Sequence, residues 1–138
     1  MIVVDEYLAL RVLVAPPPPW LGNDELGLPT SRHWRILQAM HHPRGGQLSR
    51  LLAGLEDEDR QALRHPSSEL MTVIDPRPLL DDAAVISARF SGTGWLTAET
   101  LAAGVAHGRR LFFATEHNVG LLLARAAAEL GVAVEVLT

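Results

Sequence analysis

Four short apolar runs constrain the fold of this chain more than any other feature of its sequence. The first covers residues 2–4, and the others lie within residues 69–76, 109–115 and 132–138. Continuous apolar runs of this length are typical of strands that are buried on both faces. Segments with a helical pattern separate them, and such alternation predicts a parallel sheet between two layers of helices. We therefore predict one three-layer α/β domain over residues 1–138, with a central parallel sheet of about four strands.

The segments between these runs carry the signals of seven helices. Thr30 or Ser31 is the expected N-cap of the second helix, and Gly131 is expected to end the last one. Pro16 to Pro19 are four consecutive prolines, which cannot continue a helix and predict an extended connector inside the domain. The helices are predicted within residues 7–14, 29–41, 43–55, 56–65, 78–90, 96–108 and 116–131.

Charge and composition narrow the possible functions. The net charge of −4 argues against a protein that coats nucleic acid by bulk electrostatics. The chain has no cysteine, which excludes disulfides and thiolate metal sites. Its first residues do not form a signal peptide, and no stretch approaches the roughly 20 apolar residues of a membrane helix. We expect a cytoplasmic protein with no membrane partner.

Acidic residues occur where the predicted strands and helices would bring them to one edge of the sheet. Asp5 and Glu6 follow the first strand, Glu116 follows the third, and Glu99 opens the helix before the third strand. Ligands bind at the carboxyl ends of the strands in such sheets. A cluster of carboxylates there favours Mg²⁺ or Mn²⁺, which could activate a water and stabilise charge on a phosphate.

Three segments of the chain resemble the PIN domain, the family that contains the VapC-type toxins of bacterial toxin–antitoxin pairs. They are MIVVDEYLAL at the start, LTAETLAAGVAHGRRLFFATEHN later, and AAAELGVAVEVL near the end. The resemblance implies a Mg²⁺- or Mn²⁺-dependent endoribonuclease that cuts RNA, is restrained by a cognate antitoxin, and pairs as a homodimer. It also implies that Asp5, Glu99 and Glu116 are the catalytic metal ligands, with Thr115 completing the site.

Arginine side chains could supply the contacts to RNA phosphates, because their planar forks match phosphate oxygens. Arg11 and Arg32 are the candidates for direct phosphate contact. Arg35 and Arg44 could extend an RNA path, with Trp34 stacking on a base. The alternative, which we favour for this helix, is a solvated arginine face with a buried tryptophan.

A second function hypothesis follows from the departures from the family pattern. The family usually has aspartates at the positions of Glu99 and Glu116, and a further glutamate on a helix in the first half. The helix that begins near residue 30 carries Arg32, His33 and Gln38 instead. These features favour a catalytically degenerate PIN-like domain that acts as a protein-binding or regulatory module.

Each acid also has a purely structural interpretation. Asp5 could cap the first helix, and Glu116 could lie in a helix capped by Thr115. Glu99 could lie in a first turn after Thr97, where the helix dipole favours an acid. A flavodoxin-like domain with capping acids is therefore a third interpretation.

Overall fold

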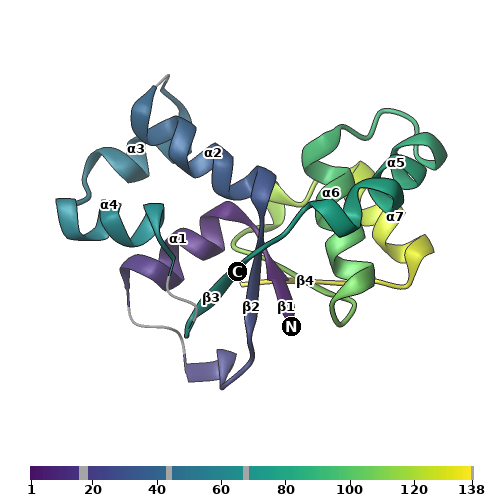
Figure 1. Cartoon of the computed structure of the whole chain (residues 1–138), viewed down its shortest axis with the longest axis horizontal. Coiled ribbons are helices and arrows are strands. Elements are labelled where there is room, and N and C mark those ends of the chain that lie inside the picture. The colour runs from purple at the N-terminus through teal and green to yellow at the C-terminus, as the bar shows by residue number, and fades with distance from the viewer. Residues whose placement is uncertain (16–18, 43–44, 67–68, 138) are drawn as a thin grey trace.

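A five-stranded parallel sheet forms the centre of the molecule (Figure 1), as seen in a computed structural model that describes residues 1–15, 19–42, 45–66 and 69–137. The strand order is β3-β2-β1-β4-β5, and every neighbouring pair is parallel. Starting from the central strand β1, the chain adds β2 and β3 on one side of the sheet. It then returns and adds β4 and β5 on the other side. The strands are β1 (Ile2–Val4), β2 (Leu26–Pro29), β3 (Met71–Ile74), β4 (Arg110–Phe113) and β5 (Ala133–Val136).

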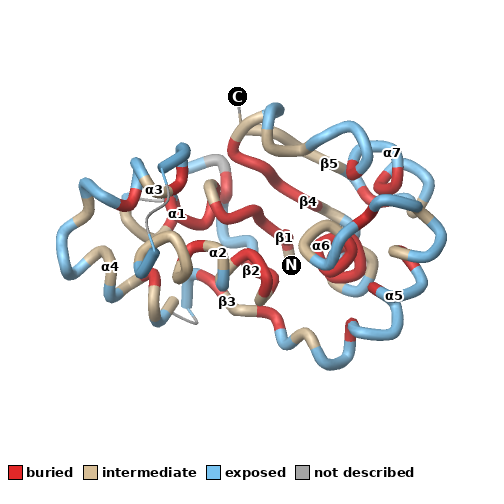
Figure 2. The backbone as a smooth tube through the Cα atoms, turned by 90° about the horizontal axis from the view of Figure 1, so that it is seen from above, coloured by how far each residue is buried: buried red, intermediate tan, exposed pale blue. Residues whose placement is uncertain are grey.

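Helices cover both faces of the sheet, so the predicted three-layer α/β architecture is confirmed (Figures 1 and 2). The first four helices lie on one face and the last three on the other. Three short 3₁₀ turns, η1 (Pro19–Leu21), η2 (Arg77–Leu79) and η3 (Glu116–Asn118), complete the described elements. The helices are α1 (Glu6–Val14), α2 (Thr30–His41), α3 (Gly46–Ala53), α4 (Asp57–Arg64), α5 (Leu80–Arg89), α6 (Trp95–Ala106) and α7 (Leu121–Leu130).

Alternating side chains of the central strands supply two apolar cores, one on each face. In β1, Ile2 and Val4 pack toward the core of α1 to α4, whereas Val3 packs toward the core of α5 to α7. In β4, Phe112 belongs to the first core and Phe113 to the second. This alternation is the period of two that a strand imposes. It explains why these runs are apolar without interruption.

The strand β2 was not predicted, and it raises the strand count from about four to five. Its sequence LGLP contains glycine and proline, which are depleted in strands. A Cβ on Gly27 would lie 2.4 Å from Met1 Sδ and 2.8 Å from Ile74 Cδ1. Close packing therefore favours glycine here, although glycine removes the usual strand signal.

Two predicted helix starts are wrong. Pro29, not Thr30 or Ser31, precedes α2, and the Thr30 hydroxyl donates to the Ile74 carbonyl at 2.7 Å. The helix α7 begins only at Leu121, after η3, and not near residue 116. The helix α6 begins at Trp95, one residue before its predicted start. The predicted end of α7 at Gly131 is confirmed by its left-handed φ of 70°. The predicted proline connector lies outside the described residues except for Pro19.

The observed strand order also excludes the flavodoxin-like interpretation. That fold has the order 2-1-3-4-5, whereas this sheet has the order 3-2-1-4-5. Here the chain reverses direction between β1 and β4, and ligands in such sheets bind outside the carboxyl ends of the strands at this switch point. No helix in the described part of the chain is long and apolar enough to cross a membrane.

Candidate functional site

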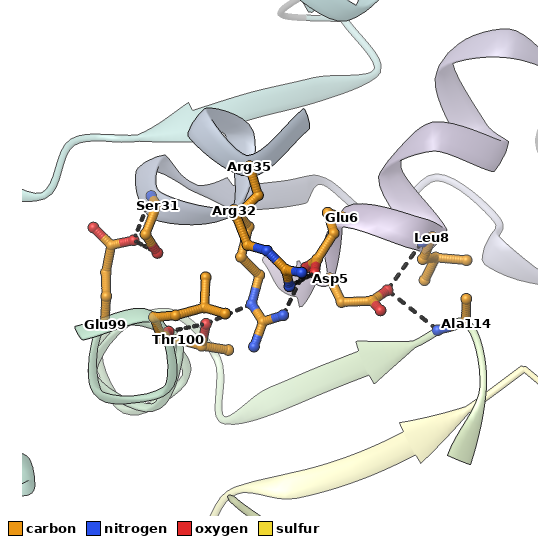
Figure 3. Close-up of polar contacts among 10 residues, drawn as sticks. Asp5, Glu6, Leu8, Ser31, Arg32, Arg35, Glu99, Thr100 and Ala114 are labelled. Atoms are coloured by element: carbon orange, nitrogen blue, oxygen red, sulfur yellow. Dashed lines mark hydrogen bonds and ion pairs between the residues drawn. The ribbon is translucent and has the colours of Figure 1, made fainter. Parts of the chain in front are cut away.

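Asp5 directly follows β1 at the carboxyl edge of the sheet. Its side chain links the end of β1 to the first turn of α1 and to the residue after β4. Its Oδ1 accepts a hydrogen bond from the Leu8 amide at 2.9 Å, which caps α1, and one from the Ala114 amide at 3.2 Å, just after β4. The predicted capping role is therefore confirmed (Figure 3). Its Oδ2 is buried and has no hydrogen-bond partner among the described residues.

Burial makes Asp5 an unusual carboxyl. Its side chain is 1% exposed, and desolvation raises its pKa from 3.8 to about 6. The charge of Glu6 adds to this rise in pKa, whereas the amides of Leu8 and Ala114 and the charge of Arg32 oppose it. Asp5 is ionised at pH 7, but at a cost to the folded state.

This raised pKa predicts how stability depends on pH. Because the folded state holds the Asp5 proton more tightly than the unfolded state, the free energy of unfolding falls as pH rises from about 4 to about 6. A difference of about two units corresponds to roughly 3 kcal/mol. Urea unfolding at a series of pH values should show this fall in the wild type. In Asp5→Asn the fall should be smaller by that amount, and parallel curves for the two proteins would contradict the assignment.

Glu6 lies beside Asp5 in sequence but belongs to a different network. Its carboxylate is 1% exposed and binds two arginines of α2. Arg32 Nη1 lies 2.7 Å from Glu6 Oε2, and Arg35 Nη1 binds Glu6 Oε1. The Arg35 side chain is 40% exposed, whereas the Arg32 side chain is 5% exposed. One buried carboxylate is thus paired with one buried and one half-exposed cation.

Arg32 makes contacts with several elements at this edge of the sheet (Figure 3). Its Nε donates to the Thr100 hydroxyl of α6 at 2.7 Å, and its guanidinium lies 5.3 Å from the ring centre of Phe113. The Thr100 hydroxyl in turn donates to the Leu96 carbonyl at 2.8 Å. Arg32 therefore joins α1, α2, α6 and the end of β4 through one buried positive charge.

Glu99 is completely buried and caps a helix to which it does not belong. Its Oε1 accepts from the Ser31 amide at 2.8 Å and from the Ser31 hydroxyl at 2.6 Å, at the N-terminus of α2. Pro29 at the cap position of α2 makes no side-chain cap bond, so Glu99 supplies the missing acceptor from α6. It lies in the second turn of α6, so its predicted place in a first turn is wrong. Glu99 Oε2 is buried without a partner in the described part of the chain.

The other predicted site residues are distributed around this buried network. Glu116 is exposed in η3, and Thr115 before it makes no side-chain capping bond, so its predicted capping role is wrong. Arg11 is exposed on α1. Arg32, predicted to contact phosphate, is enclosed, whereas Trp34 is 57% exposed. The favoured interpretation of this helix as a solvated arginine face with a buried tryptophan is therefore wrong.

A divalent ion does not fit this arrangement of the described residues. Residues 1–15, 19–42, 45–66 and 69–137 contain no group of three histidine, aspartate or glutamate side chains placed to hold a metal. One carboxylate oxygen of Asp5 and one of Glu99 already accept hydrogen bonds from amides at a helix N-terminus, and Glu6 is paired with two arginines. A Mg²⁺ ion needs near-octahedral oxygen ligands, and the buried Arg32 already supplies positive charge there.

Sequence reasoning missed the pairings that define this edge. Glu6 was predicted as part of an acidic cluster and Arg35 as part of an RNA path, but their pairing with each other and the roles of Ser31 and Thr100 were not predicted. The spacing of Arg32 and Arg35 on one helix face was a usable signal, because residues three apart are neighbours on a helix. Their common partner, Glu6, lies 26 residues before Arg32 and could be found only from the fold.

Comparison with known proteins does not assign the chain to a family. No family model matches the sequence, and no curated protein matches it. The resemblance to PIN domains therefore rests on the sequence segments quoted above.

Proposed function

We propose that this chain is a catalytically degenerate PIN-like domain that acts as a protein-binding or regulatory module. The observation that carries the proposal is the place of Arg32. Its guanidinium is paired with Glu6, bonds to Thr100, and lies close enough to Asp5 to lower the pKa of that carboxyl, so it brings to this edge the positive charge that an ion would supply. A guanidinium supplies fixed positive charge and hydrogen bonds, but it cannot activate a bound water as a metal ion does.

The hydrogen bonds and ion pairs of these acids give each of them a structural role that does not require catalysis. Asp5 holds the start of α1 against the residue after β4, and Glu99 holds the start of α2 against α6. Glu6 and Arg32 connect α1 with α2. Buried polar groups that are joined in this way fix a single arrangement of the surrounding elements. A rigid edge of this kind suits a module that presents a constant surface to a partner.

Two exposed tryptophans near this edge supply surface for a partner. Trp34 on α2 is 57% exposed, and Trp95 at the start of α6 is 46% exposed. Together with Thr30 and Ser31 they line a pocket of about 390 Å³. Exposed tryptophans are enriched in protein interfaces and often dominate their binding energy. This pocket supports a binding role next to the buried network.

The second candidate is the metal-dependent ribonuclease, and one observation favours it. Asp5 Oδ2 and Glu99 Oε2 are both buried without a partner among the described residues. A Mg²⁺ or Mn²⁺ ion could satisfy oxygens of this kind if Arg32 moved away. For a ribonuclease of this kind we expect an RNA substrate, a cognate antitoxin as protein partner, a homodimeric state and a cytoplasmic location.

Cleavage of RNA separates the two candidates. Wild type and Asp5→Asn, purified in parallel, would be incubated with single-stranded RNA of mixed sequence and Mn²⁺. The module predicts equal cleavage by the two proteins, at the level of a buffer control. Cleavage by the wild type that falls at least about a hundredfold in Asp5→Asn would support the ribonuclease instead.

A further inference from the structure

A groove between α1 and α3 lies apart from the Arg32 network, by which we mean Glu6, Arg32, Arg35 and Thr100. The segment after β4 closes one end of it, and its volume is about 250 Å³. One wall comes from the helix after β1, and the closed end comes from the residues that follow β4. The groove therefore lies at the switch point between β1 and β4, where ligands bind in sheets of this kind.

Aliphatic side chains form the long walls of this groove. Leu10 and Val14 of α1 face Leu51 of α3 and Leu55 just beyond it. Leu51 is 44% exposed, whereas the other two leucines of the same helix, Leu48 and Leu52, are buried. A hydrocarbon that covered these side chains would remove their apolar surface from water, which stabilises a complex by about 25 cal/mol per Å².

Hydrogen-bond donors gather in the same groove. Tyr7, Arg11, Thr115 and Asn118 line it, and Arg11 is the only charged residue among the described residues of its lining. In the described part of the chain, the side chains of Tyr7, Arg11 and Thr115 make no hydrogen bond or ion pair. Asn118 Nδ2 is buried there without a partner. An unpaired buried amide costs about 1–3 kcal/mol, which an acceptor on a ligand could offset.

We propose that this groove binds a small amphipathic acid, with its carboxylate at Arg11 and the donor groups and its aliphatic tail along the walls of α1 and α3. The single arginine among the described lining residues matches the single charge of a carboxylate, whereas RNA would need a row of cations. The volume of the groove is just below the range of drug-sized sites, so the tail is short. None of these residues belongs to the Arg32 network, so the test does not depend on whether the chain cleaves RNA.

Calorimetry with octanoate tests the site on the full chain, below the concentration at which octanoate forms micelles. We expect saturable binding to one site, weakened about tenfold in Arg11→Gln by loss of a charge-assisted hydrogen bond. Leu51→Gln should also weaken binding. Both residues are exposed, so neither change should affect folding.

The matched controls are Arg50→Gln and Leu80→Gln, which change an exposed arginine and an exposed leucine outside the groove. Both should bind octanoate as the wild type does. The neutral analogue 1-octanol should bind at least about tenfold more weakly than octanoate. Equal binding of octanol and octanoate, equal binding by Arg11→Gln and the wild type, or no saturable binding would overturn the proposal.

Discussion

Replacing Arg32 with methionine is expected to lower the free energy of unfolding by about 3 kcal/mol at pH 7, because it removes the buried partner of a buried carboxylate. Glu6 would keep only Arg35, whose side chain is 40% exposed. Methionine preserves much of the aliphatic stem, so the loss reports mainly on the charge and its hydrogen bonds. Urea unfolding at pH 7 measures the change, and an unaltered urea slope would show that the unfolding transition itself is unchanged.

The control is Arg35→Met, which removes the other cation bound to the same carboxylate. Because Arg35 is partly exposed, its loss should cost only about 1 kcal/mol. Both arginines contact Glu6, so the predicted difference follows from the burial of Arg32 and from its further contacts with Thr100 and Phe113. Equal costs, or a larger cost for Arg35, would contradict the central place given to Arg32.

Replacing Glu99 with alanine should lower the free energy of unfolding by about 2–4 kcal/mol. The change leaves the amide and hydroxyl of Ser31 buried without their acceptor, at about 1–3 kcal/mol for each group, part of which relaxation or water recovers. It also removes the only side-chain cap of the α2 N-terminus among the described residues. Thermal and urea unfolding would measure the loss.

Glu99→Gln is the matched variant, because glutamine keeps an acceptor for Ser31 and removes the negative charge. If Glu99 acts as a cap, glutamine should recover at least half of the stability that alanine loses. A glutamine variant as unstable as the alanine variant would show that the charge, and not the cap, matters at this position. That result would favour a role for Glu99 in binding a cation.

Apolar runs revealed most of the fold because the central strands β1 and β4 are apolar on both faces. Residues 2–4 and 111–114 each supply alternate side chains to both cores, so no polar residue interrupts them. The strand β2 escaped prediction because it contains Gly27, which packs closely against the Met1 and Ile74 side chains, and Pro29, after which α2 begins. Local propensity cannot show that a glycine is buried in a sheet.

The candidate site was only partly predictable, for a different reason. The position of Asp5 after a buried strand indicated both its edge location and its cap, and both are confirmed. The partners of Glu6 and Glu99 lie on helices far away in the sequence. An arginine on a helix with polar neighbours also gives no sign of whether it is buried. The burial of Arg32 and the exposure of Trp34 depend on how α2 packs against α6 and the sheet.

The most direct test of the account is a calorimetric titration of the purified wild-type protein with Mn²⁺, beside Asp5→Asn. If Arg32 takes the place of an ion, the wild type should give no saturable heat of binding, and the two titrations should coincide. Saturable binding of one Mn²⁺ by the wild type, weakened in Asp5→Asn, would contradict the account and identify the buried acids as a metal site.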